Sequence, residues 1–349
     1  MVSPLFAYRI FARFMLLTLL SGMGMISAMA GANADSLNIY SYRSPVLLQP
    51  FLDAYEAETG TQFQIVHAPK GLVQRLQAEG QNTKADLVLT VDISRIVELE
   101  KSGLLTPLGS DIIAQNIPAH LRSQDDLWTA LSARARIAAV SSTRVADGEI
   151  TRIEDLAKPE WAGRICTRKG SHVYNRALLA SLIAHNGEAA AKAWTEALVS
   201  NLARRPQGND RAQAKAIWSG ECDVALMNTY YYGKMKFNDE EPEQKQWADA
   251  IKLVFLNQAD RGQHVNISGG GILKTSKKQA EARAFLEWLT SDKAQTIYAS
   301  VNYEYPVNPS VAADPEVFSW GQFKIDDLPL DEIARLSARA QRIIDQTGW

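Results

Sequence analysis

Residues 37–45, with the sequence LNIYSYRSP, begin the pattern that decides the fold. The first six residues predict a strand. Ser44 then suits a helix N-cap, and Pro45 suits the first position of the helix. Apolar residues recur at helical spacing as far as Tyr55, and Gly60 follows as a helix-ending residue. The stretch therefore predicts a strand that leads directly into an amphipathic helix.

The same alternation continues along the chain. Strands are predicted at residues 63–67 and 86–90, and helices at 71–80 and 93–102. A β-α-β-α-β-α order implies a parallel sheet covered by helices. A strand-rich stretch at residues 128–145 follows and suits a crossover between two domains. Strands and helices alternate again beyond it.

The segment 1–34 has the pattern of a secretory signal peptide. Two arginines precede an apolar stretch at residues 15–30, and Ala-Asn-Ala at 32–34 supplies a cleavage site. The alternative is a membrane anchor, but this stretch is short for a span of about 20 residues. We expect cleavage before Asp35 and export to the periplasm.

The charge balance argues against nucleic acid as a partner. The 349 residues carry 37 Lys and Arg against 39 Asp and Glu. The segment 1–34 contains two of the arginines and no acid, so the remaining 315 residues have a formal charge of −4. They offer no basic surplus to neutralise phosphates. Their number is sufficient for two domains.

Two tyrosine-bearing segments, residues 170–175 (GSHVYN) and 228–233 (NTYYYG), each follow an apolar strand and begin a helix. In open α/β sheets, ligands bind at the ends of strands. We therefore expect the phenols of Tyr174, Tyr230 and Tyr231 to converge on one ligand. A tyrosine pair alone would more often be a packing feature, and Tyr232 is expected to be structural.

Phenols have a pKa near 10 and bind metals as phenolates. A trivalent ion such as Fe³⁺ favours that deprotonation. Helix starts favour negative charge as well, and we expect Ser171 and Thr229 to cap the two helices. Three phenolates balance Fe³⁺ but fill half of an octahedral shell. Arg43, at the end of the first strand, is expected to hold a synergistic anion such as carbonate, because a bare cation facing the metal is unfavourable. Water is the alternative for the remaining positions.

The two cysteines, Cys166 and Cys222, lie in strand-like runs just before the tyrosine segments. An oxidising compartment permits a disulfide between them, and we expect one. The alternative is a pair of buried thiols. Their spacing matches no zinc pattern. Three glycines at residues 269–271 suit close backbone packing or a bend, in preference to a phosphate-binding loop.

The whole chain after residue 34 resembles the periplasmic ferric-iron-binding proteins of ABC transporters. The resemblance rests on the opening strand 37–43, the framework segments 85–90, 156–164 and 303–307, and the ligand loops 171–175 and 228–231. It implies an α/β, two-lobed periplasmic-binding-protein fold of class II. Each lobe would be a mostly parallel sheet flanked by helices, and hinge strands would cross near residues 135 and 265. The lobes would comprise residues 35–135 plus 265–310, and residues 136–264 plus 311–349.

The resemblance implies that the family's iron ligands correspond to Tyr174, Tyr230 and Tyr231 in this chain, and that these residues bind Fe³⁺. Some members add a His or Tyr after the opening strand. Ser44 and Pro45 stand there in this chain, which indicates the three-tyrosine subgroup. We expect a monomeric, non-enzymatic protein that delivers iron to a membrane permease.

The sequence leaves two other functions open. Arg43 and the two helix starts suit a metal-free oxyanion such as sulfate or a phosphonate. An exported hydrolase is the other alternative, but the sequence contains neither G-x-S-x-G nor H-E-x-x-H.

Overall fold

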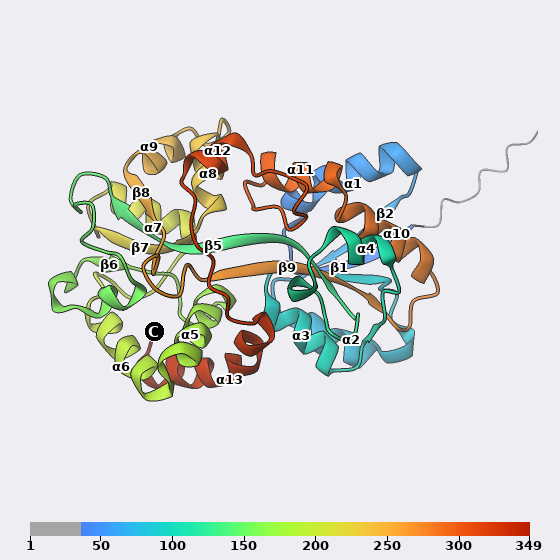
Figure 1. The fold of residues 1–349 in the computed structure, drawn as a ribbon, viewed down its shortest axis with the longest axis horizontal. Coiled ribbons are helices and arrows are strands. Elements are labelled where there is room, and N and C mark those ends of the chain that lie inside the picture. The colour runs from blue at the N-terminus through green and yellow to red at the C-terminus, as the bar shows by residue number, and fades with distance from the viewer. Residues whose placement is uncertain (1–35) are drawn as a thin grey trace, which may run out of the picture. The chain divides into compact units, whose positions relative to one another are not determined.

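The computed structural model of the protein describes residues 36–349 (Figure 1). The predicted signal peptide at residues 1–34 lies outside them. Across the described part of the chain, no helix combines the length and apolar character that a bilayer span requires.

The strands form a nine-stranded sheet system in the order β2-β1-β3-β9-β5-β7-β6, with β4 beside β9 and β8 beside β5. Their bounds are β1 Leu37–Ser41, β2 Phe63–His67, β3 Leu87–Thr90, β4 Leu105–Thr106, β5 Thr129–Ser141, β6 Ile165–Cys166, β7 Val224–Asn228, β8 Ile251–Val254 and β9 Val265–Leu273.

The helices cover the two sheets. Their bounds are α1 Pro45–Thr59, α2 Leu72–Glu79, α3 Ile93–Lys101, α4 Asp111–Asn116, α5 Val173–Asn186, α6 Glu188–Ser200, α7 Asp210–Trp218, α8 Tyr230–Lys236, α9 Glu243–Asp249, α10 Gln279–Leu289, α11 Asp292–Ser300, α12 Pro315–Ser319 and α13 Leu330–Thr347. Short 3-10 turns lie at Gly80–Asn82, Ala119–Leu121, Ile153–Ala157 and Pro159–Trp161. Helix α13 packs against α5, α6 and α3.

The opening strand and helix form where the sequence predicts them. Pro45 occupies the first turn of α1, and Gly60 ends the helix in the left-handed conformation at φ 74°. Glycine adopts this conformation without the steric cost of a Cβ atom. Ser44 is the N-cap residue, although its side chain makes no capping hydrogen bond. Strand β1 pairs in parallel with β2 and β3, as the alternation predicts.

The sheets are mixed, however, and the expectation of mostly parallel pairing is met only in part. Strands β6 and β7 are parallel, but β9 runs antiparallel to β3, β4 and β5, and β5 runs antiparallel to β7 and β8. The long strand β5 belongs to both sheets. Its first half pairs with β9 and its second half with β7, so β5 and β9 lie side by side through the middle of Figure 1.

Close packing explains the three glycines of β9. A Cβ atom at Gly270 would lie 2.7 Å from Leu286 Cδ2, and one at Gly271 would lie 3.0 Å from the Leu127 carbonyl oxygen. The glycines stand inside a strand that is paired on both sides, so the packing interpretation is confirmed. The register between β5 and β9 shifts opposite Gly269.

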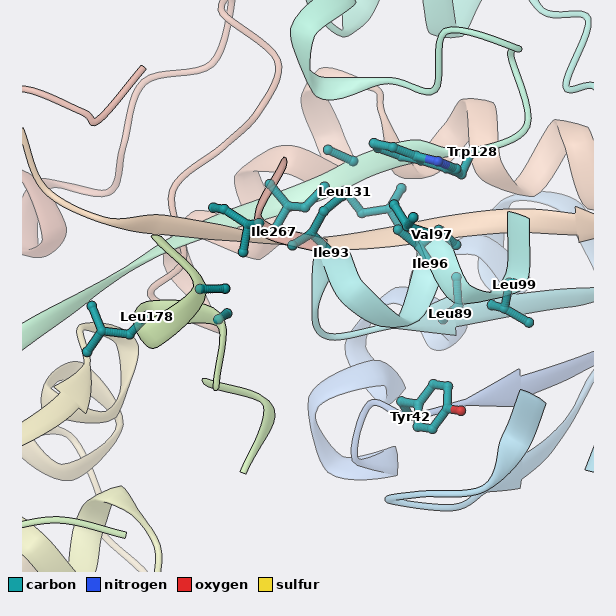
Figure 2. Close-up of a cluster of buried hydrophobic side chains, with 14 of the residues drawn as sticks. Tyr42, Leu89, Ile93, Ile96, Val97, Leu99, Trp128, Leu131, Leu178 and Ile267 are labelled. Carbon is teal, nitrogen blue, oxygen red and sulfur yellow. The ribbon is translucent and has the colours of Figure 1, made fainter. Parts of the chain in front are cut away.

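Two clusters of buried side chains form the core. The larger contains residues of both sheets and of α1, α3, α5, α10 and α13, and Figure 2 shows part of it around Ile96, Leu131 and Ile267. The smaller cluster lies among β6, β7 and α7 to α9. It includes the predicted disulfide between Cys166 and Cys222, which is present with a Cα–Cα distance of 5.9 Å. The bridge ties β6 to the start of β7.

Candidate metal site

The ends of two neighbouring strands bring Tyr174 and Tyr230 together. Strands β6 and β7 run in parallel, so both chains leave the sheet at the same edge. The first enters α5 one residue before Tyr174, and the second enters α8 at Tyr230. The two hydroxyl oxygens lie 3.1 Å apart, which is hydrogen-bonding distance.

Tyr231 joins this pair. Its ring centroid lies 4.4 Å from that of Tyr230, with 34° between the ring planes. Tyr231 also interacts electrostatically with Tyr174. Tyr232 instead packs edge-on against Trp320, with the ring centroids 5.5 Å apart. The structure thus groups the three predicted ligands and separates the tyrosine that was expected to be structural.

The surroundings of the cluster keep two of its phenols protonated. Burial, followed by the nearby Tyr174 and Tyr231, raises the pKa of Tyr230 well above 10. Burial, followed by Tyr174 and Asp210, also raises the pKa of Tyr231. Both residues are therefore neutral at pH 7 without a ligand, and a cation that binds their oxygens has to displace the protons.

Of the two predicted helix caps, Ser171 is wrong, and Thr229 occupies the N-cap position without making a capping hydrogen bond. The N-cap of α5 is His172 rather than Ser171, and its Nδ1 accepts the Tyr174 backbone N–H at 3.3 Å. Thr229 already has helical angles, φ −52° and ψ −44°, so its side chain makes no capping bond. Its buried Oγ1 has no hydrogen-bond partner. Burial, followed by the charge of Arg168, lowers the pKa of His172 to about 3, so its imidazole is neutral.

A buried ionic network holds the two ligand-bearing segments in register. Asp210, which is fully buried, lies 2.7 Å from Arg136 and 3.0 Å from Arg168. Asp210 also accepts the backbone N–H of Asn228 at 2.9 Å. Arg136 in turn donates to the side-chain oxygens of Asn228 and Asn175, at 3.0 and 2.7 Å. Asn175 follows Tyr174 directly and Asn228 precedes Tyr230 by two residues, so the network fixes the backbone beside both tyrosines.

Arginine side chains surround the phenol rings. The guanidinium carbons of Arg134, Arg136 and Arg168 lie 5.6, 5.7 and 5.3 Å from the ring centroid of Tyr174. Arg211 lies 5.4 Å from that of Tyr231. Asp210 compensates Arg136 and Arg168. Arg134 is as buried as Arg136, both at 2% exposed, but differs because its Nη2 has no hydrogen-bond partner.

Arg43 already has a counter-charge, which its place in the sequence does not reveal. Its Nη2 lies 2.6 Å from a carboxylate oxygen of Glu304, and its Nη1 donates to Ser268 Oγ at 2.9 Å. Burial lowers the pKa of Arg43, but the attraction and hydrogen bond of Glu304, together with Tyr298 and Tyr230, outweigh it, so the net shift is upward. The premise that Arg43 is an uncompensated cation is therefore wrong. Its role in anion binding stays a prediction.

The residues that the sequence did not point to are all buried charges. Arg134 and Arg136 lie in the buried strand β5, and Asp210 and Glu304 are 0% and 3% exposed. A buried charge is rare without a partner, and for the two arginines the apolar strand around them is a signal that the sequence does contain. Among residues 36–349, no group of three or more His, Cys, Asp and Glu side chains is arranged to hold a metal.

A mixed sheet system flanked by helices, with polar side chains gathered at the ends of its strands, defines an α/β binding protein. Residues 82–327 match the family described as bacterial extracellular solute-binding proteins. Iron uptake protein A1 of Synechocystis sp. is 40% identical over 316 residues, which cover 90% of this chain and 88% of that protein.

Two solved structures are similar over almost their whole length. Apo ferric ion-binding protein A of Pasteurella haemolytica has a TM-score of 0.87 and 41% identity, and the match covers 90% of this chain and 98% of that one. A Trichodesmium protein in complex with iron and citrate ligands has a TM-score of 0.83 and 38% identity, with 90% and 99% covered. This chain belongs to the family of periplasmic ferric-iron-binding proteins of ABC transporters, within the bacterial extracellular solute-binding proteins. The predicted fold class and the expectation of a non-enzymatic protein are confirmed by this membership.

Proposed function

We propose that this protein binds Fe³⁺ through the phenolates of Tyr174, Tyr230 and Tyr231 and delivers it to the permease of an ABC transporter. The observation that carries the proposal is the phenol cluster, in which two hydroxyls lie 3.1 Å apart at adjoining strand ends. Relatives named for iron uptake and ferric-ion binding support the choice of metal. Three phenolates compensate the charge of a ferric ion, and hard oxygen donors suit it.

An anion completes the coordination shell in this proposal. Arg134 is the better placed arginine to hold it, because its Nη2 is buried and has no partner, whereas Arg43 is paired with Glu304. Ser268 joins the two arginines, since its Oγ accepts from Arg43 at 2.9 Å and lies 3.5 Å from Arg134 Nη1. Carbonate and citrate both have the carboxylate geometry that a guanidinium recognises. Arg43 and Arg134 would then bind the anion together, where the sequence pointed to Arg43 alone.

The two lobes would move about β5 and β9. Ala135 pairs with Val265, at the two positions where the hinge crossings were expected. We propose the lobe boundaries given by the sequence, residues 35–135 plus 265–310 and residues 136–264 plus 311–349. Ligand binding would then close one lobe on the other. Export as a monomer after cleavage before Asp35 belongs to the same proposal, and N-terminal sequencing of the secreted protein tests the cleavage.

Visible absorbance tests the metal assignment. Purified residues 35–349 receive ferric citrate, and the spectrum is recorded together with the iron content. Iron bound to phenolate is coloured, so an absorbance band that weakens and shifts in Tyr231→Phe and stays unchanged in Tyr232→Phe is the expected result. Iron that binds without this band, or a band that Tyr231→Phe leaves unchanged, contradicts phenolate coordination.

The buried Nη2 of Arg134, which has no hydrogen-bond partner, favours one alternative, a metal-free oxyanion ligand. Calorimetry separates the two proposals. A sulfate or phosphonate that binds in the presence of a strong iron chelator, with no colour in the ferric titration, supports the oxyanion function.

A further inference from the structure

Gly233 and Tyr303 each occupy a backbone position that disfavours that residue. Gly233 lies inside helix α8, where glycine is destabilising relative to alanine. Tyr303 has φ 57°, in the left-handed region that a bulky side chain rarely adopts. The two residues contact each other, and the contact accounts for both choices.

The ring of Tyr303 lies flat against the Gly233 backbone. A Cβ atom at position 233 would lie 2.5 Å from Tyr303 Cγ and 2.8 Å from both Cδ atoms, which no side chain can tolerate. Phe237, one turn further along, stacks on the same ring with the centroids 5.6 Å apart and 16° between the planes. The left-handed backbone at Tyr303 is held by hydrogen bonds from its N–H to Ala299 and from the next N–H to Tyr298, both 3.1 Å.

Both residues of this contact are close in sequence to residues of the proposed metal and anion site. Gly233 follows Tyr230 by three residues, so it lies on the same side of α8 as Tyr230. Tyr303 directly precedes Glu304, the counter-charge of Arg43, and Arg43 interacts electrostatically with Tyr230. Tyr303 thus contacts helix α8, which carries Tyr230 and Tyr231, and the adjacent Glu304 pairs with Arg43.

We propose that Tyr303 is a positioning residue that clamps helix α8 through Gly233 and thereby slows release of the bound ion. The proposal rests on the function proposed above. The segment that carries Tyr303 follows α11, which packs against α1 and β5, whereas α8 packs against α7, α9 and β7. The contact between Tyr303 and Gly233 therefore joins elements that pack on different sheets. When the lobes open, Tyr303 and Gly233 would move apart.

The test measures the rate at which iron passes from loaded protein to a strong chelator, followed by loss of the phenolate absorbance. Tyr303→Gly removes the ring and suits the left-handed backbone, and it should raise the release rate about three- to tenfold, the range expected for a lost aromatic contact. Tyr303→Phe keeps the ring and should release iron at the wild-type rate. Gly233→Ala should also accelerate release, but should have no further effect in a Tyr303→Gly background, where the Cβ meets no ring.

A merely structural role would lower the unfolding temperature and leave release from the folded protein unchanged. The proposal is therefore overturned if Tyr303→Gly releases iron at the wild-type rate, or if Tyr303→Phe is as fast as Tyr303→Gly. Should Tyr303→Gly not fold, Gly233→Ala alone decides, with an unchanged rate counting against the clamp. A wild-type protein that never becomes coloured refutes the proposed function instead, so the two failures are distinct.

Discussion

Proton release on metal binding provides the sharpest check on the phenol cluster. The pKa of Tyr231 is raised above 10 by burial and by Tyr174, so its hydroxyl is protonated at pH 7. Ionising a phenol at least three pH units below its pKa costs at least about 4 kcal/mol, at 1.36 kcal/mol per unit. In the proposed complex, the bound Fe³⁺ would supply that free energy and expel the proton. For each phenol proton that the metal displaces, the affinity for iron falls about tenfold per pH unit of acidification.

The change to examine is Tyr231→Phe, which keeps the ring and removes one ionisable oxygen. Calorimetry of iron binding in two buffers with different ionisation enthalpies counts the protons released per ion. The variant should release one proton fewer than the wild type, and its affinity should fall by more than about 100-fold, since loss of an outer partner of a ligand alone costs 10–100-fold.

Tyr232→Phe is the matched control, because Tyr232 is the adjacent phenol and packs against Trp320. It should release the same number of protons as the wild type and keep the wild-type affinity. An equal proton count in the wild type and in Tyr231→Phe would refute the role of Tyr231 as a phenolate ligand.

Three further changes concern the support of the site. Asp210→Asn leaves two buried arginines without their counter-charge and should lower the free energy of unfolding by about 3–5 kcal/mol in denaturant titrations; a loss below about 1 kcal/mol would show that the network is dispensable. Replacing Cys166 and Cys222 together by serine opens a loop with a sequence separation of 56 and should cost about 4 kcal/mol, measured against the oxidised wild type. No difference between the two would contradict the stabilising role of the bridge. Gly270→Ala places a methyl group 2.7 Å from Leu286 Cδ2 and should lower the unfolding free energy by about 1–3 kcal/mol, whereas an unchanged value would show that the strand can shift.

Local sequence signals located the elements but not their directions. Pro45 and Gly60 mark both ends of α1, and hydrophobic spacing locates the helices that cover the sheets. The direction of β9 depends on where the chain returns after a separation of more than a hundred residues from β5. Strand polarity has no local signature, so the mixed character of the sheets could not be predicted from the alternation of strands and helices.

The site was predictable where it depends on local order. Tyr174 and Tyr230 follow strands that end at one edge of a sheet, and that order is visible in the sequence. Glu304 lies 261 residues from Arg43, and Asp210 lies 74 residues from Arg136, so neither pair has a spacing rule. The error at Ser171 has a different cause, because serine and histidine can both cap a helix, and the backbone begins the helix one residue later than expected.

The 3.1 Å contact between Tyr174 and Tyr230 also has a consequence for selectivity. Empty, the cluster presents hydroxyl groups instead of fixed negative charges, unlike the carboxylate sites that attract Ca²⁺ and Mg²⁺. In the proposed site, those divalent ions would be too weak as Lewis acids to strip protons from the phenols at neutral pH, so they would not occupy the cluster. The phenol protons would therefore restrict metal binding to ions that are acidic enough to replace them.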